Sequence, residues 1–221
     1  MNPRVTIVVP TFNEEILIPR FERQLASLDG KFNVIFTDGF SKDQTFNLIT
    51  YPKIQEARGR GAQLNAGAKY ANTEYIWFLH IDTKIHPESI RAIEDSGAEV
   101  GCFTIRFDSK GPVMKVEEWC SIARVTIRNV AFGDQGIFIK KDLFDQIGGY
   151  KEIPIMEDYQ LSLDIKEMGL KFKQLKLPIG VSARKFRKEG PINTIIRMQY
   201  LQHLYRQGED IEKIKKLYYG D

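Results

Sequence analysis

The stretch VTIVVPTFNE, residues 5–14, decides the fold class of this chain. Its first five residues are β-branched without interruption. A continuous run of this kind is typical of a strand that is buried on both faces, as in a parallel sheet. The polar residues that follow, from Thr11 to Glu14, therefore stand at the carboxyl end of a predicted first strand.

Strand and helix patterns alternate after this stretch. Apolar residues at helical spacing predict a helix over residues 17–28, and strands are predicted at residues 33–37 and 74–79. Two more helices are predicted, one after the N-cap residues 41–43 and one over residues 63–71. This alternation indicates an α/β fold with a parallel sheet, and such sheets bind ligands at the carboxyl ends of their strands.

The second half of the chain is less regular. Strands are predicted at residues 101–107 and 136–140, and helices at residues 113–130 and 157–168. Another helix is predicted after Pro191, where apolar residues cover too wide an arc for a simple surface helix. That helix is expected either to pack on several sides or to dock on another surface.

Composition and charge limit the classes of protein. Apolar residues make up 43% and charged residues 28%, and the apolar runs are far shorter than the roughly 20 residues that cross a bilayer. The N-terminus is interpreted as a strand and not as a signal peptide. Cys102 and Cys120 lie in no metal spacing and form no disulfide framework, which favours a reducing cytoplasm.

The C-terminal region is basic. From residue 184 onward, nine Lys and Arg residues stand against five Asp and Glu residues. Such a region could contact a membrane surface, a phosphorylated acceptor or only water.

Polar clusters follow each of the three clearest predicted strands. They occupy residues 10–15, 38–45 and 80–83. If the strands are parallel, the clusters meet at one edge of the sheet, where a nucleotide would bind. One cluster alone carries little information, because an Asp-Gly pair such as residues 38–39 is most often a turn.

Six segments occur in a fixed order: VVPTFNE, DGFSKDQT, RGRGAQLNAGAKYA, FLHIDT, GDQGIF and MEDYQLSL. In order and spacing they resemble the family 2 glycosyltransferases of the GT-A fold, over residues 5–187. The strongest resemblance is to the short stand-alone branch known as radical-SAM/selenodomain-associated transferases. The resemblance implies an α/β GT-A fold, with a mostly parallel central sheet flanked by helices, and a hexosyltransferase-like enzyme.

The resemblance also implies one domain over residues 1–221. Residues 1–100 would form the nucleotide-binding half, residues 101–190 the acceptor half, and residues 191–221 the C-terminal helices. The donor would be a nucleotide sugar.

In that family the first two motifs hold the nucleoside. The resemblance implies that Thr11 and Glu14 line the base and ribose, and that Asp38 accepts a base N–H, since an ionised acceptor makes the stronger hydrogen bond. Arg58 and Arg60 would lie near the diphosphate, which a guanidinium fork matches in geometry, although an exposed basic loop is the alternative. The full set expected at the nucleotide is Pro10, Thr11, Asn13, Glu14, Asp38, Arg60, Asn65 and Ile81.

FLHIDT stands where the family usually has an Asp-x-Asp that holds a divalent metal, so His80 replaces the first carboxylate. Asp82 and His80 are the expected metal ligands, with Mn²⁺ or Mg²⁺ as the cofactor, and imidazole suits Mn²⁺ better than Mg²⁺. A packed histidine bonded to the backbone is the alternative for His80. Ser41 is expected to cap the next helix rather than to bind ligand, and Asp43 could do the same.

The motif at Glu157 and Asp158 matches the family's Glu-Asp pair, in which the aspartate is the base of inverting members. Inversion by a single displacement needs a carboxylate that takes the proton of the acceptor hydroxyl, and Asp158 is the candidate. A helix cap or dipole partner is the alternative. Asp134 and Gln135 would lie between sugar and acceptor, and Arg184 matches a basic position that contacts phosphate or acceptor.

The sequence therefore predicts an inverting glycosyltransferase. One alternative is a nucleotidyltransferase of related fold, although such enzymes usually have a Gly-rich loop where this chain has PTFNE. The other is a non-catalytic nucleotide-sugar-binding protein, because the first carboxylate of the metal motif is missing.

The acceptor could be a lipid, a saccharide or a small molecule. We expect no nucleic-acid partner and a cytoplasmic location. Peripheral membrane contact through the basic C-terminal region and a homodimer are left open.

Overall fold

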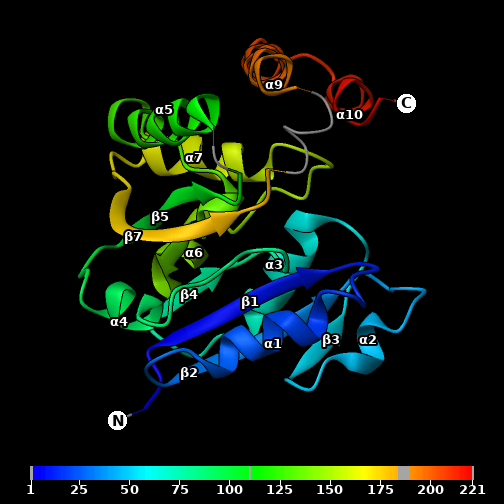
Figure 1. The fold of residues 1–221 in the computed structure, drawn as a ribbon, viewed down its shortest axis with the longest axis vertical. Helices are drawn as coiled ribbons and strands as arrows, with labels where there is room; N and C mark the ends of the chain where they lie inside the picture. The colour runs from blue at the N-terminus through cyan, green and yellow to red at the C-terminus, as the bar shows by residue number, and fades with distance from the viewer. Residues whose placement is uncertain (1, 110, 184–189, 221) are drawn as a thin grey trace.

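The computed structural model describes residues 2–109, 111–183 and 190–220. At its centre is a seven-stranded sheet with the order β3-β2-β1-β4-β6-β5-β7 (Figure 1). The strands are β1 Val5–Thr11, β2 Phe32–Asp38, β3 Lys53–Gln55, β4 Tyr75–Phe78, β5 Val100–Phe107, β6 Phe138–Lys140 and β7 Lys173–Val181. Strand β1 pairs in parallel with β2 and β4, β2 with β3, and β5 with β7, whereas β6 runs antiparallel to β4 and β5. The mostly parallel α/β sheet is confirmed.

Helices cover both faces of this sheet. They are α1 Ile18–Ala26, α2 Thr45–Leu48, α3 Arg60–Lys69, α4 Ser89–Glu94, α5 Pro112–Arg128, α6 Lys141–Ile147, α7 Glu157–Glu167, α9 Pro191–Arg206 and α10 Ile211–Tyr219, with a 3₁₀ turn η1 at Gly133–Gln135. In Figure 1, α1 crosses one face of β1 and β2. Helices α1 and α4 form one apolar cluster with the sheet, and α3, α5, α6 and α7 form the other.

The β-branched run in β1 supplies both clusters. Ile7 and Val9 belong to the cluster with α1, and Val8 belongs to the cluster with α3. All three are fully buried, because successive side chains of a strand point to opposite faces. Full burial of each such side chain contributes roughly 1.5–3 kcal/mol.

Helix α3 lies very close to the sheet because of Gly67. A Cβ at this position would stand 2.4 Å from Cγ1 of Val8 and 3.0 Å from Cγ2 of Thr37. The glycine in the RGRGAQLNAGA segment therefore lets the helix backbone approach β1 and β2, which brings the start of α3 to the carboxyl ends of those strands.

Strand β7 was not predicted. It forms one edge of the sheet, next to β5. Pro178 lies at an irregularity in its pairing with β5, where the register shifts between Phe103 and Thr104. Proline has no backbone N–H to donate to the ladder, and it is tolerated at such a place because no donor is needed there. The short strand β3 at the other edge was not predicted either.

The last two described helices pack on the segment before α7. Leu201 of α9 and Ile214 of α10 are fully buried in a cluster with Ile155, Met156 and Tyr159. The expected helix after Pro191 is confirmed and is packed on one side, while Ile192 and Ile196 of α9 remain more than 60% exposed. Among the helices of the described residues, none is both long enough and apolar enough for a membrane crossing.

Candidate functional site

A cavity of about 820 Å³ opens at the carboxyl ends of β1 and β4. Pro10, Thr11 and Glu14 line it from the β1 side, and His80, Ile81 and Asp82 line it from the β4 side. The start of α3, the start of α7 and the end of α10 complete the wall. This volume lies within the range of about 300–1,000 Å³ that small-molecule sites occupy.

Asp38 lies under the cavity rather than on its wall. The residue is fully buried, and its Oδ1 accepts hydrogen bonds from the hydroxyls of Thr11 and Ser41. Its Oδ2 accepts from the backbone N–H of Ser41 at 2.9 Å and from Nε2 of Gln55 at 3.4 Å. The predicted contact with a base is not available in this arrangement, because the carboxylate is covered and paired with protein donors.

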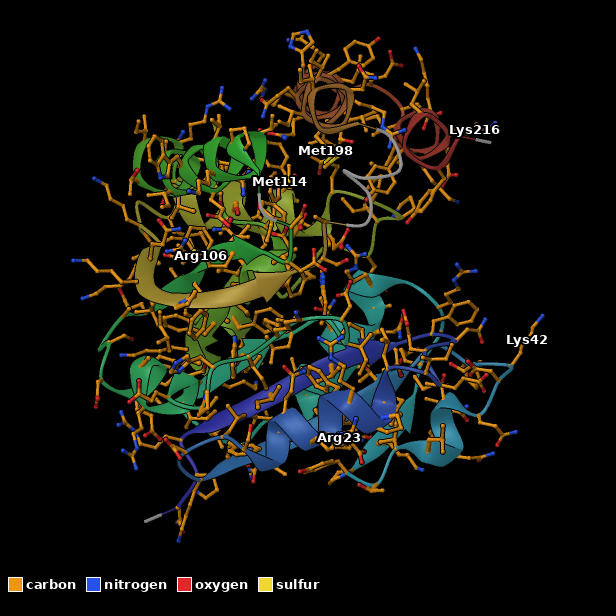
Figure 2. The ribbon with its side chains drawn as sticks, in the orientation of Figure 1. Arg23, Lys42, Arg106, Met114, Met198 and Lys216 are labelled. Atoms are coloured by element: carbon orange, nitrogen blue, oxygen red, sulfur yellow. The ribbon has the colours of Figure 1, made fainter. Side chains whose placement is uncertain are left out.

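The loops after β1 and β2 are tied together by their side chains. The Asn13 N–H donates to Oγ of Ser41 at 2.9 Å, and the Lys42 N–H donates to Oδ1 of Asn13 at 2.8 Å. Lys42 itself projects from this loop into solvent (Figure 2). Asn13 adopts a positive φ of 54°, which asparagine tolerates better than most residues. Asn13 therefore shapes the loop, and it is absent from the cavity wall.

Helix α2 begins at Thr45 with Gln44 as its N-cap, so the expectation that Ser41 caps this helix is wrong. The Ser41 hydroxyl instead bonds to Asp38. Asp43 does take a capping contact, because its Oδ1 accepts from the Thr45 N–H at 2.9 Å.

Asn65 binds protein and not the cavity. Its Nδ2 donates to the Tyr150 carbonyl at 2.9 Å, and its Oδ1 accepts from the Tyr150 N–H at 2.8 Å. These two bonds hold the chain after α6 against α3. The nucleotide contact expected of Asn65 does not fit this geometry.

Gln63 is a residue that the sequence analysis missed. It lines the cavity, is buried, and donates from Nε2 to the carbonyls of Thr11 at 2.9 Å and Thr37 at 2.7 Å. It thereby joins α3 to the ends of β1 and β2. A polar residue on the packed side of the predicted helix was the available signal.

Two arginines stand at the start of α3. The guanidinium carbon of Arg58 lies 4.1 Å from the centre of the Phe12 ring, a cation–π geometry. Nη1 of Arg60 lies 3.0 Å from Oε1 of Glu157, with the Arg60 side chain 48% exposed and the Glu157 side chain 4% exposed. Both arginines line the cavity, as expected for a site that takes phosphate.

The Arg60–Glu157 pair is perturbed on both sides. Burial raises the pKa of Glu157, the neighbouring Asp158 adds to that rise, and Arg60 opposes it. Burial opposes ionisation of Arg60, but the carboxylates of Glu157 and Asp158 outweigh it and raise its pKa. Arg60 therefore stays charged, and it holds a carboxyl that burial would otherwise neutralise.

Asp158 is not among the residues of the cavity wall in the described chain, and it lies near His80, with Gly133 close to both side chains. Its Oδ2 accepts from the Gly133 N–H at 2.8 Å. A Cβ on Gly133 would stand 2.9 Å from Nε2 of His80 and 3.5 Å from Oδ2 of Asp158. The glycine therefore lets the imidazole and the carboxylate lie close together. Burial, and then the charge of Arg60, lower the pKa of His80 to about 3, so its ring is neutral at physiological pH.

Asp134 has an unsatisfied oxygen. Its Oδ1 is buried without a hydrogen-bond partner among the described residues. Burial raises its pKa to about 6, Arg124 opposes the rise, and the carboxylates of Asp158 and Glu117 add to it. Perturbed carboxyls of this kind occur at functional sites, since a group that titrates near neutral pH can exchange protons.

Gln135 faces the core and does not reach the cavity. It is fully buried, with Oε1 accepting from Nη2 of Arg124 at 3.0 Å and Nε2 near the Phe103 carbonyl at 3.4 Å. The predicted contact with sugar or acceptor is therefore not available to Gln135. Arg184, the other residue predicted for that role, lies outside the described residues.

A metal ion at Asp82 would need further ligands from a bound molecule, because the protein offers few ligands there. Asp82 is exposed on the cavity wall, and His80 presents a neutral ring nearby in the chain. Within the described ranges, no three His, Cys, Asp or Glu side chains are grouped to hold a metal. Mg²⁺ and similar ions are commonly held by one or two carboxylates plus substrate phosphates, so the residues present fit such an ion.

Comparison with known proteins identifies the matching family. The model of glycosyl transferase family 2 matches residues 6–151. Among curated proteins, the beta-monoglucosyldiacylglycerol synthase of Trichormus variabilis (strain ATCC 29413 / PCC 7937) is 23% identical over 189 residues, which cover 72% of this chain and 40% of that protein.

Solved structures show the same fold. The mannosyltransferase PcManGT from Pyrobaculum calidifontis, in complex with GDP-Man and Mn²⁺, has a TM-score of 0.69 at 20% identity, covering 92% of this chain and 62% of that one. TarS 1-349 from S. aureus, in complex with UDP-GlcNAc, has a TM-score of 0.65 at 20% identity, covering 82% and 58%. The chain thus spans 40% of the curated relative and about three fifths of these solved chains. The expected GT-A fold is confirmed.

Proposed function

The chain belongs to glycosyl transferase family 2, and on that premise we propose that it transfers a sugar from a nucleotide-diphosphate donor to an acceptor hydroxyl, with inversion at the anomeric carbon. The supporting observation is the convergence of four chain segments on one cavity: the ends of β1 and β4 and the starts of α3 and α7. Solved structures of similar fold were obtained with UDP-GlcNAc and with GDP-Man, which makes a nucleotide sugar the natural donor class.

The nucleoside would lie against the end of β1, where Thr11 and Glu14 line the cavity. Asp38 would support this site from below by fixing Thr11 and Ser41, rather than by contacting the base. The role that the sequence assigned to Asp38 thus becomes one of positioning.

The diphosphate would lie at the start of α3. Helix N-termini attract anions because their first N–H groups lack partners within the helix. Arg60 adds a guanidinium with five N–H donors, of which one contacts Glu157. Arg58 lies beside it on Phe12. Together these groups would stabilise the charge of the departing nucleoside diphosphate.

A divalent ion would be held by Asp82, with His80 as a further candidate ligand and the donor phosphates completing its shell. When bound, it supplies positive charge to the diphosphate oxygens. PcManGT was solved with Mn²⁺, and the same ion is proposed here.

Asp158 would accept the proton of the acceptor hydroxyl. As that oxygen forms its bond to the anomeric carbon, the bond from the anomeric carbon to the diphosphate oxygen breaks, and the nucleoside diphosphate leaves with the electron pair. The Gly133 N–H orients the carboxylate for this task. Asp134, with its raised pKa and unsatisfied oxygen, would bind the acceptor or the sugar beside it.

A ligand panel tests the donor class. Thermal unfolding would be measured with UDP, GDP, ADP and CDP, each with and without Mn²⁺. A ligand at one hundred times its dissociation constant stabilises by about 2.7 kcal/mol, which raises the Tm by roughly 5–10 °C for a chain of this size. If no nucleoside diphosphate raises the Tm, the proposal fails.

Turnover assays with the nucleotide that binds best separate the alternatives. Release of nucleoside diphosphate from the matching nucleotide sugar supports the transferase. Binding without any turnover would favour a non-catalytic binding protein, and release of pyrophosphate from a nucleoside triphosphate with sugar phosphate would favour a nucleotidyltransferase. The hexosyl group, the acceptor, a homodimer, membrane contact, the cytoplasmic location and the radical-SAM-associated branch stay predictions.

A further inference from the structure

Helix α10 lines the same cavity as the family motifs, although it lies outside the matched residues 6–151. Lys215, Tyr218 and Tyr219 all belong to the cavity wall. Figure 1 places α10 on the side of the molecule toward which β1 runs. The C-terminal region therefore contributes side chains to the site, and these have no assigned role.

The position of α10 is defined by its packing. Ile214 is fully buried against Ile155 and Met156, the two residues that immediately precede Glu157. Asp210 caps the helix by accepting from the Glu212 N–H at 3.1 Å. One helical turn after Ile214, Tyr218 lies on the same face of the helix and packs against the same cluster. The anchor of α10 is thus the segment that also positions Glu157 and Asp158.

Tyr218 lines the cavity together with Arg60 and Glu157. Burial raises the pKa of its phenol, Arg60 opposes the rise, and Asp158, Asp134 and Glu157 add to it. The hydroxyl therefore stays protonated close to one guanidinium and several carboxylates. A neutral phenol can both donate and accept a hydrogen bond, as recognition of a sugar hydroxyl requires.

Lys215 brings a positive charge to a wall whose Arg60 is already paired with Glu157. Nζ of Lys215 contacts Oε2 of Glu212 at 3.1 Å, but both side chains are largely exposed, at 43% and 57%. Exposed ion pairs of this kind contribute little to stability. The ammonium group of Lys215 can therefore leave Glu212 and bind an anion in the cavity with little loss of free energy.

We propose that α10 forms part of the donor site, with Lys215 binding the diphosphate and Tyr218 binding the sugar of the nucleotide-diphosphate sugar. This inference rests on the proposed function and extends it to a region beyond the family motifs. The C-terminal helix then sets donor affinity and sugar selectivity, whereas the end of β1 holds the nucleoside.

Three variants test this assignment: Lys215→Ala, Tyr218→Phe and the control Lys216→Ala. Lys216 is the next residue of the same helix, is exposed, and is not among the residues of the cavity wall in the described chain. Dissociation constants would be measured by calorimetry for UDP or GDP, whichever stabilises the parent protein more, for its monophosphate and for its nucleotide sugar.

Lys215→Ala is expected to weaken diphosphate binding about 10-fold or more, since a charge-assisted hydrogen bond contributes about 1.5–3 kcal/mol. Its affinity for the monophosphate should stay within about 2-fold of the parent. Tyr218→Phe should weaken binding of the nucleotide sugar and leave that of the diphosphate nearly unchanged. Lys216→Ala should bind all three ligands like the parent.

The outcomes keep the two proposals apart. If the parent binds the diphosphate and Lys215→Ala and Tyr218→Phe both bind all ligands equally well, the role of α10 is refuted while the proposed function stands. If the parent binds no nucleoside diphosphate at all, the proposed function fails, and this inference fails with it. Lys215 is partly exposed, so its variant is expected to fold even if Tyr218→Phe does not.

Discussion

The buried aspartates on the two sides of the cavity differ in how completely their oxygens are satisfied. On the side of β1 and β2, the carboxylate of Asp38 accepts hydrogen bonds from three protein residues, and Asn13 holds the neighbouring loop. On the side of η1 and α7, Asp134 keeps a buried oxygen without a partner in the described chain, and burial raises the pKa of Glu157.

This difference separates a scaffold from a reactive centre. Groups that are fully paired inside the protein stabilise the fold and gain little from a ligand. Buried groups that stay unsatisfied lower the stability of the fold but are available to a substrate. Functional sites commonly combine these two properties. Substitutions on the first side should therefore cost stability, and substitutions on the second should cost activity while sparing or even raising stability.

The largest effect is expected for Asp158→Asn. Loss of the general base should lower kcat by roughly 10²–10⁴-fold, with donor affinity within a few fold of the parent. Steady-state turnover of the nucleotide sugar, together with the donor dissociation constant, would measure this. Glu157→Gln is the matched variant, and it should act on donor binding through Arg60 instead. Full turnover in Asp158→Asn, with loss of turnover in Glu157→Gln, would move the base to Glu157.

The next largest effect is expected for Asp38→Asn. A neutral amide would replace a buried carboxylate that accepts from Thr11, Ser41 and Gln55, so hydrogen bonds to a charged acceptor would become weaker bonds to a neutral one, at a cost of about 3 kcal/mol. Urea unfolding would measure the loss. Lys42→Ala in the same loop is the control and should stay within about 0.5 kcal/mol, since Lys42 projects into solvent (Figure 2). An unchanged stability of Asp38→Asn would contradict the scaffold assignment.

An effect of opposite sign, and at most of similar size, is expected for Asp134→Asn. Burial raises the folded-state pKa of Asp134 from 3.8 to about 6, so the ionised form costs stability at every pH above that value. The variant should be more stable than the parent at pH 8, by up to about 3 kcal/mol. This advantage should shrink as the pH falls from 6 toward 3.8 and vanish below about pH 3, where Asp134 is protonated in both the folded and the unfolded parent. Thermal unfolding across this range would detect it, and an advantage that grows on acidification would contradict the argument.

Much of the fold could be predicted because its main signals are local. The β-branched run of β1 and the apolar period of α1 predicted a strand and a helix that both form. Strand β7 was missed because it lies at an edge and contains Pro178, and a short strand such as β3 leaves hardly any pattern.

The candidate site was predicted less completely. Thr11, Glu14, Arg60, Ile81 and Asp82 do line one cavity. Asn65 and Gln135 do not line it. Asn65 is hydrogen-bonded to the backbone of Tyr150, and Gln135 accepts a hydrogen bond from Arg124. Lys215 and Tyr218 were not singled out, since nothing in a basic helix near the end of the chain indicates which of its residues will face a ligand.

The sequence by itself determined the alternation of strands and helices in the first half of the chain, the class of the sheet and the edge at which polar residues gather. These follow from the period of apolar side chains and from where each strand ends, both of which are properties of neighbouring residues. The tertiary structure alone decided which polar groups are hydrogen-bonded within the protein and which are left to bind a ligand. That outcome depends largely on hydrogen-bond partners from distant parts of the chain, and a carboxylate such as Asp134 carries no local sign of whether the fold will supply a partner.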